Sequence, residues 1–181
     1  SAFIKSIRAS DPNAAVYYLA RMVEGGEDPK FIARRLLIAA SEDIGNANPT
    51  ALVLANNTFQ AVERIGWPEA RIVLSQCTIY LATSAKSNAS YTAIGLAQAH
   101  LREHGEAAVP LALRNAPTEL MKNLGYGQHY EYDHNLDGQF SGQECMPEGM
   151  EGTKFFEPGD NPKEQGAREW LRARWGAKFG Y

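Results

Sequence analysis

The acidic segment Asp133–Glu144 has the residue types and spacing of a calcium-binding loop. It places carboxylates or amides at its first, third and fifth positions, a glycine at the sixth and Glu144 at the twelfth, as an EF-hand loop does. An EF-hand also needs a helix on each side, but the residues before this loop are rich in glycine and tyrosine, and a proline follows closely. A polar turn explains the same residues. We keep a calcium-binding regulatory module at residues 133–144 as the second of two functions considered for this chain, the first being self-assembly.

A second motif, His100-Leu-Arg-Glu-His104, places two imidazoles one helical turn apart, and such a pair can share a zinc ion. Gly105 follows at once, so His104 belongs to the last turn of its helix, where the helix dipole favours histidine. The sequence offers no clear third ligand further on. We therefore expect a helix-end role and predict no metal site there.

The C-terminal residues combine cations with aromatic rings, a combination that can contact nucleic acid. The candidate contacts are Arg168, Arg172, Arg174 and Lys178, interleaved with Trp170 and Trp175. A solvated helix face anchored by the tryptophans is the competing interpretation. The net charge of −3 argues against a surface built throughout to neutralise phosphates.

Several other classes of site are not indicated. The sequence contains neither the phosphate-binding G-x-x-x-x-G-K-[ST] string nor the G-x-S-x-G elbow, so we predict no catalytic residue and no cofactor in this chain. Two cysteines, Cys77 and Cys145, are too few for a disulfide scaffold. No apolar run reaches the roughly 20 residues that a membrane span needs. We expect a cytoplasmic chain with no membrane partner.

These candidate residues must be positioned by helices. Proline recurs at residues 12, 29, 49 and 68, each time before a helical pattern, and Asp11 and Asp28 directly precede the first two. Proline suits the first helical position and aspartate caps the free backbone N–H groups. Glycines at 25, 26, 45 and 66 stand where these helices should end.

The apolar spacing predicts an antiparallel helical array over residues 1–105. One expected buried stripe consists of Leu52, Ala55, Phe59, Val62 and Ile65. The segment from Ala70 to Ala82 is apolar nearly all round, so its helix is either central in the array or covered by another subunit.

Residues 106–181 read as an extension that packs on this array. We predict a short helix over residues 117–124, an irregular aromatic and glycine-rich stretch over 125–161, and a last helix over 162–175. Tyr126, Tyr130 and Tyr132 alternate loosely, which allows a small hairpin. The helical pattern already in progress at the first residues suggests that the chain is part of a longer protein.

Ten segments together carry a family resemblance that spans nearly the whole chain, and it is strongest at Ala40–Gly45. They are Ser10–Met22, Gly25–Pro29, Ile32–Leu36, Ala40–Gly45, Ile79–Ala82, Lys86–Asn88, Leu113–Thr118, Leu120–Lys122, Leu124–Gly127 and Phe156–Pro158. In these segments the chain resembles the C-terminal region of the RarA/MgsA AAA+ ATPases, bacterial relatives of the Werner helicase-interacting protein.

The resemblance implies an all-α fold like the C-terminal oligomerisation (collar) domain of clamp loaders. It implies that the chain assembles with itself, typically as a homotetramer, and is not itself an enzyme. The whole protein would be a DNA-stimulated ATPase at stalled replication forks, with DNA and replication-fork proteins as partners. Its ATP and Mg would be held in an ATPase core outside this chain.

The residues expected to carry assembly lie mainly in the corner Ser41–Gly45 and in the apolar helix Ile72–Leu81, and three more come from the family-like segment Leu113–Thr118. The full set of assembly and family-motif residues is Ser41, Glu42, Asp43, Ile44, Gly45, Ile72, Val73, Ile79, Tyr80, Arg114, Asn115 and Pro117. Glu42 and Asp43 are two acids at a helix end that should disfavour them, so we predict that they contact another element. The proposed mechanism is burial of an apolar helical face between subunits.

Overall fold

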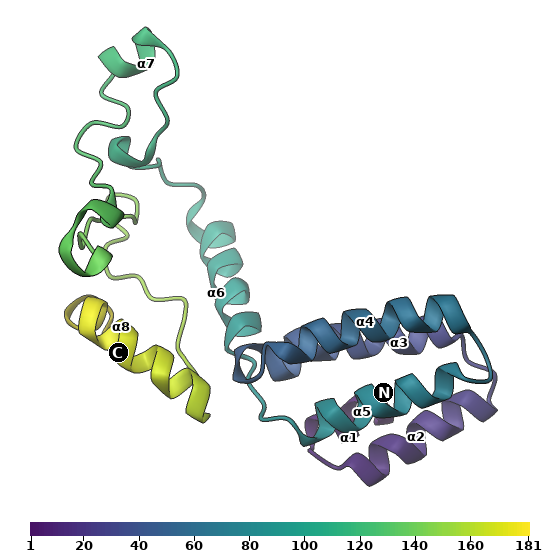
Figure 1. Cartoon of the computed structure of the whole chain (residues 1–181). Coiled ribbons are helices and arrows are strands. Elements are labelled where there is room, and N and C mark those ends of the chain that lie inside the picture. The colour runs from purple at the N-terminus through teal and green to yellow at the C-terminus, as the bar shows by residue number, and fades with distance from the viewer. The chain divides into compact units, whose positions relative to one another are not determined.

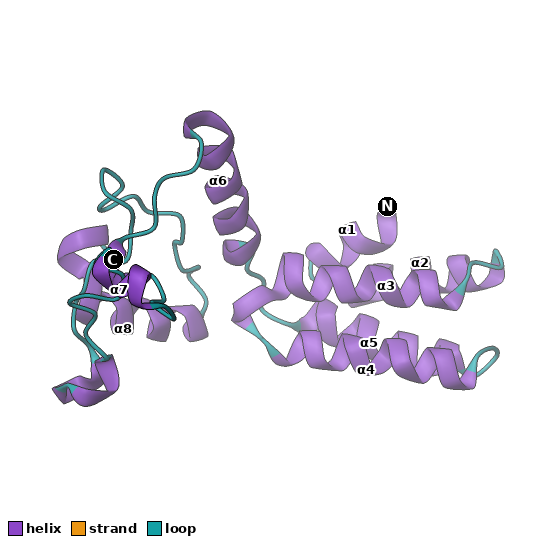
Figure 2. Cartoon of the chain, turned by 90° about the horizontal axis from the view of Figure 1, so that it is seen from above, coloured by secondary structure: helices purple, strands orange, loops and turns teal.

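The computed structural model describes residues 1–181 and contains helices, turns and loops but no strand (Figure 2). The helices are α1 Ala2–Arg8, α2 Pro12–Glu24, α3 Pro29–Ala39, α4 Thr50–Ile65, α5 Ala70–Thr83, α6 Ala89–His104, α7 Glu119–Asn123 and α8 Pro162–Phe179. A π-helical turn, Ala40–Ile44, and a 3₁₀ turn, Gly45–Ala47, link α3 to α4. The predicted all-α fold is confirmed. None of the helices is both long and apolar enough to cross a membrane.

The helix starts follow the proline and aspartate pattern. Pro12 and Pro29 stand in the first turn of α2 and α3. The side chain of Asp11 accepts a hydrogen bond from the Ala14 N–H at 2.9 Å, and that of Asp28 accepts one from the Lys30 N–H at 3.0 Å. These caps satisfy N–H groups that the first turn of a helix leaves without partners.

The chain divides into two compact units. The first unit comprises Ser1–Gly95 together with Phe156–Ala167, and the second comprises Leu96–Phe155 together with Arg168–Tyr181. The expectation that residues 106–181 pack on the helical array stays a prediction.

Helix α5 is the centre of the first unit. It packs against α1, α2, α3 and α4, and short turns reverse the chain between consecutive helices (Figure 1). Leu74, Cys77 and Leu81 are fully buried along it. The nearly all-round apolar sequence of α5 therefore serves a central helix, although Ile72 and Ile79 remain exposed.

Helix α4 buries part of the stripe predicted for it: Ala55 and Val62 are buried, and Phe59 packs partly buried against the core. Leu52 and Ile65 were expected in the core, but both are about half exposed. The buried stripe is made mostly of small residues, namely Ala51, Ala55, Thr58 and Val62. This face packs against α3 and α5, and Leu52 and its neighbour Val53 lie on the part of the helix that points outward.

The segment Phe156–Ala167 completes the first unit with the start of α8. The side chain of Asn161 caps this helix, accepting from the Glu164 N–H at 3.0 Å and donating to the Glu164 carboxylate. Glu164 is buried. A Cβ at Gly159 would lie 3.3 Å from the Ser87 hydroxyl, so this segment passes close to the loop between α5 and α6.

In the second unit, the predicted short helix is confirmed as α7, where the Thr118 hydroxyl accepts from the Met121 N–H at 3.3 Å. The hairpin prediction is wrong. Gly127 and His129 both adopt positive φ angles, +73° and +63°, so the segment turns where a strand would have to stay extended. Helix α8 continues to Phe179, beyond the predicted end at residue 175.

Candidate functional site

The corner Ser41–Gly45 joins α3 to α4 and is tied to α1 by an ion pair. Asp43 is 7% exposed and accepts from Arg8, whose Nε lies 2.6 Å from Oδ1 and whose Nη2 lies 3.3 Å from Oδ2. Glu42 Oε1 lies 3.6 Å from the same guanidinium. The hydrogen bond and the charge of Asp43 raise the pKa of Arg8. The predicted contact between these acids and another element is thus confirmed.

Gly45 lets the corner meet the loop between α5 and α6. Its backbone has φ +51° and ψ −135°, a region that side-chain-bearing residues rarely adopt. A Cβ there would lie 2.9 Å from the carbonyl oxygen of Ser87. The Ser87 N–H in turn donates to the carbonyl of Asp43 at 2.8 Å. Backbone touches backbone here, which explains why glycine occupies the end of the motif.

A polar pocket of about 400 Å³ opens at this junction. It is lined by Arg8, Glu42, Asp43, Lys86, Ser87, Asn88 and Tyr91. The Lys86 ammonium donates to the carbonyls of Ser84 at 2.6 Å and Ala82 at 3.1 Å, and to the Ser10 hydroxyl at 3.0 Å.

Burial lowers the pKa of Lys86, and the charge of Asp43 acts in the opposite sense. Two cations face two carboxylates in this pocket, so the charges balance. These hydrogen bonds and ion pairs hold α1, the corner Ser41–Gly45 and the loop between α5 and α6 together.

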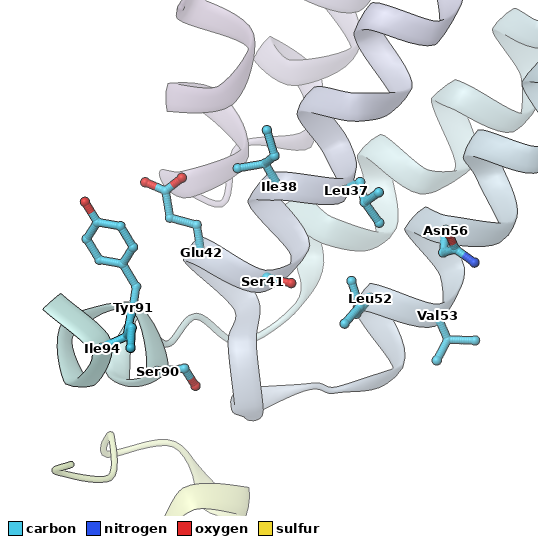
Figure 3. A pocket seen from close by; sticks show the side chains of 10 residues that line it. All are labelled: Leu37, Ile38, Ser41, Glu42, Leu52, Val53, Asn56, Ser90, Tyr91 and Ile94. Carbon is cyan, nitrogen blue, oxygen red and sulfur yellow. The ribbon is translucent and has the colours of Figure 1, made fainter. Parts of the chain in front are cut away.

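An apolar groove of about 870 Å³ lies beside the polar pocket and shares Glu42 and Tyr91 with it. Three elements contribute side chains, as Figure 3 shows. The lining residues are Leu37, Ile38, Ser41 and Glu42 from α3 and the turn after it, Leu52, Val53 and Asn56 from α4, and Ser90, Tyr91 and Ile94 from α6.

The groove is apolar and open to solvent. Val53 and Tyr91 are each 60% exposed and Ile94 is 58% exposed, although apolar side chains of this size are normally covered. Glu42 is the only charged residue in its lining, and Arg8 lies within ion-pair distance of it. Such a contiguous apolar surface is typical of a site for another molecule.

Helix α6 has no buried residue along its 16 residues. It also carries no Asp, Glu, Lys or Arg before Arg102, so solvent-exposed positions that usually bear charge are neutral. Sequence reasoning missed the groove, and the long uncharged stretch of α6 is the signal that could have indicated it.

The residues predicted to carry assembly fall in different places. Ser41 and Glu42 line the groove, whereas Asp43, Ile44 and Gly45 belong to the corner behind it. On α5, Ile72 and Ile79 are exposed, and Val73 and Tyr80 are half-buried. None of these four lines the groove.

The other predicted assembly residues, Arg114, Asn115 and Pro117, belong to the second unit. There the Arg114 Nε donates to the Val109 carbonyl at 2.7 Å, and its guanidinium lies 5.0 Å from the centre of the Tyr126 ring. Arg114 therefore makes contacts that stabilise its own loop.

The cations proposed for nucleic-acid contact already have partners in the chain. Arg174 stacks on Trp170, with its guanidinium carbon 3.2 Å from the ring centre. The Lys178 ammonium lies 2.6 Å from both Glu144 carboxylate oxygens, and Arg172 donates to the Tyr181 carbonyl at 2.9 Å. Arg168 is half-buried. Trp170, by contrast, is largely exposed.

The calcium-like loop directs its ligand atoms to other partners. Asp133 Oδ1 accepts from the Ser141 N–H at 2.6 Å, and hydrogen bonding with Ser141 lowers the pKa of Asp133. The hydrogen bond from Lys178 likewise lowers the pKa of Glu144. A calcium site needs both carboxylate oxygens of the twelfth residue, and here both oxygens of Glu144 accept hydrogen bonds from Lys178.

The histidine pair makes a helix-end contact. His104 Nδ1 lies 3.1 Å from the His100 carbonyl, and the two rings stack with their centres 4.3 Å apart. No group of three or more His, Cys, Asp or Glu side chains is arranged to hold a metal ion.

Comparison with known proteins matches residues 9–175 to the family model of the MgsA AAA+ ATPase C-terminal region. "Replication-associated recombination protein A" of Coxiella burnetii is 46% identical over 159 residues, which cover 87% of this chain and 36% of that protein. An uncharacterised protein of Thermotoga maritima is 48% identical over 180 residues, covering 99% of this chain and 29% of its own length. "ATPase WRNIP1" of Dictyostelium discoideum is 45% identical over 158 residues, covering 87% and 18% respectively. The chain thus spans about a third or less of these relatives.

Proposed function

Because the chain belongs to the family of MgsA AAA+ ATPase C-terminal regions, we propose that it is the assembly module of a replication-associated recombination ATPase. Several copies associate, four in the expected arrangement, and the chain itself performs no catalysis. ATP and Mg are bound by the ATPase core of the longer protein, of which this chain would form about a third.

The observation that carries this proposal is the lack of cover over α6 and the groove beside it. A helix of this length with no buried residue is marginal in water unless another surface packs on it. Tyr91 and Ile94 of α6, with Val53 across the groove, offer apolar area that a second chain can bury.

Assembly of this kind would set the symmetry of the whole protein. Closed symmetric contacts repeat the same surface on each copy, so the attached ATPase cores are placed at regular positions. Obligate interfaces between copies commonly bury about 2,000 Å² or more.

DNA and replication-fork proteins would be contacted by the assembled protein in the cytoplasm. Within this chain, the exposed Trp170 with Arg174 stacked on it is the best candidate for a base-stacking contact. A mobility shift of the chain on single-stranded DNA, lost on Trp170→Ala and weakened by salt, tests this. Unchanged binding by Trp170→Ala would remove the α8 contact from the proposal.

Absolute mass by light scattering across a concentration series tests the assembly itself. We expect a mass of about four copies that persists on dilution to the micromolar range. A single-copy mass at every concentration would overturn the proposal for this chain.

A further inference from the structure

We infer that the groove between α3, α4 and α6 holds α6 of a second copy, in a two-fold contact in which each copy inserts α6 into the other. The inference rests on the proposed assembly function and adds the surface and the occupant.

The shape of the surface suits pairing with itself. A two-fold contact needs one patch that is complementary to its own copy. Here Leu37 and Leu52 line the groove from α3 and α4, while α6 lines it from the other side with the exposed Tyr91 and Ile94 (Figure 3). When two such patches meet face to face, the exposed side chains of each α6 can enter the facing groove. The groove volume of about 870 Å³ leaves room for several side chains.

The charges also favour an uncharged occupant. Glu42 is the only charged residue of the groove, and Arg8 is its ion-pair partner. An acidic segment would find no opposite charge there to offset the loss of its hydration, and a basic segment would find only Glu42, which already lies 3.6 Å from Arg8. The stretch of α6 from Ala89 to Leu101 contains no Asp, Glu, Lys or Arg, so it matches the groove in polarity. Among the helices of this chain, α6 is also the long one with no buried residue.

Gly95 leaves room for a close neighbour on α6. Glycine weakens the interior of a helix, so its presence there usually has a packing reason. Apart from its chain neighbours and the backbone of its own helix, no atom lies within 4 Å of the position its Cβ would take. Close approach of a helix from a second copy, beside Ile94, supplies that reason.

Disulfide trapping tests the contact directly. In a Cys145→Ser background, which removes the exposed native thiol, Val53→Cys and Ile94→Cys are prepared separately and mixed before mild oxidation. We expect a covalent dimer that contains one chain of each variant. Tyr17→Cys on α2, which is as exposed as Val53, is the matched control and should give no dimer with either variant.

Two charge substitutions provide a second measurement. Val53→Glu and Ile94→Glu should each raise the Kd of self-association about a hundred-fold or more, and Tyr17→Glu should change it less than about three-fold. If the chain assembles but the 53–94 disulfide does not form and both glutamate variants still assemble, the inference is overturned and the assembly function stands. If the unmodified chain has a single-copy mass throughout, both fail.

Discussion

Replacing Gly45 by alanine should destabilise the chain more than the same change at Gly66, because of these two glycines only Gly45 lies against the backbone of another segment. Gly45 ends the corner that joins α3 to α4, with φ +51° and ψ −135°. Gly66, after α4, has a similar backbone, with φ +62° and ψ −167°. A Cβ at Gly45 would lie 2.9 Å from the Ser87 carbonyl oxygen, whereas at Gly66 nothing lies within 4 Å.

The two positions separate backbone strain from close approach. An L residue held in this region of φ and ψ costs about 1–3 kcal/mol, and this cost applies to both variants. At Gly45 the added methyl group must also displace the Ser87 carbonyl, which is backbone of a packed loop, at about 1–3 kcal/mol more. The expected losses in free energy of unfolding are therefore about 1–3 kcal/mol for Gly66→Ala and about 2–6 kcal/mol for Gly45→Ala.

Urea unfolding followed by circular dichroism at 222 nm measures both variants against the parent chain. The difference between the two midpoints, with unchanged slopes, reports the close approach alone. Equal midpoints, or a smaller effect at Gly45, would refute the argument that contact with Ser87 selects glycine in this corner. Gly45→Ala should also shift the loop that precedes α6, so amide hydrogen exchange at Ser87 provides an independent readout.

Three further predictions concern the second unit and the thiols. Calcium at millimolar concentration should release no heat on calorimetric titration, because Lys178 occupies both oxygens of Glu144 at 2.6 Å; a binding isotherm that Glu144→Gln abolishes would contradict this. Because Lys178 lowers the pKa of Glu144 from 4.5, this pair stabilises the chain at pH values above 4.5 and loses its effect as the pH falls through the lower folded value. Lys178→Met should therefore reduce stability by up to about 1 kcal/mol at pH 7 and progressively less in acid, and an equal loss at both pH values would argue against the ion pair as the cause. Burial raises the pKa of Cys77 to about 11, so a disulfide reagent at pH 8 should modify one thiol per native chain, Cys145, and two in urea; two fast thiols in the native chain would show that Cys77 is accessible.

The helices and their ends follow from local sequence. Asp11-Pro12 and Asp28-Pro29 predict the starts of α2 and α3, and Gly105, with φ +76°, follows the end of α6. These signals are local because capping and backbone preferences act over a few neighbouring residues. The apolar sequence of α5 predicted a helix covered on several sides but left open whether other helices of the chain or another subunit cover it; the structure shows that α1, α2, α3 and α4 pack against it.

The partners of polar side chains could not be predicted in this way. That Asp43 needed a contact was evident from its place at a helix end, but its pairing with Arg8, 35 residues away, depends on how α1 packs against the array. The loop Asp133–Glu144 satisfies a calcium pattern position by position. Its last ligand is nevertheless taken by Lys178, 34 residues further along the chain, and no local pattern encodes that.

The sequence by itself determined the all-α class, the positions of most helices and the family, because these depend on short-range backbone preferences and on residue identities. Only the tertiary structure decided which apolar residues stay outside the core. Leu52 and Val53 lie in the same helix as Ala51 and Ala55 but point away from its buried face, and the packing of α4 against α3 and α5 decides which face of α4 is buried. The groove therefore arises from long-range packing, which the spacing of apolar residues within one helix cannot specify.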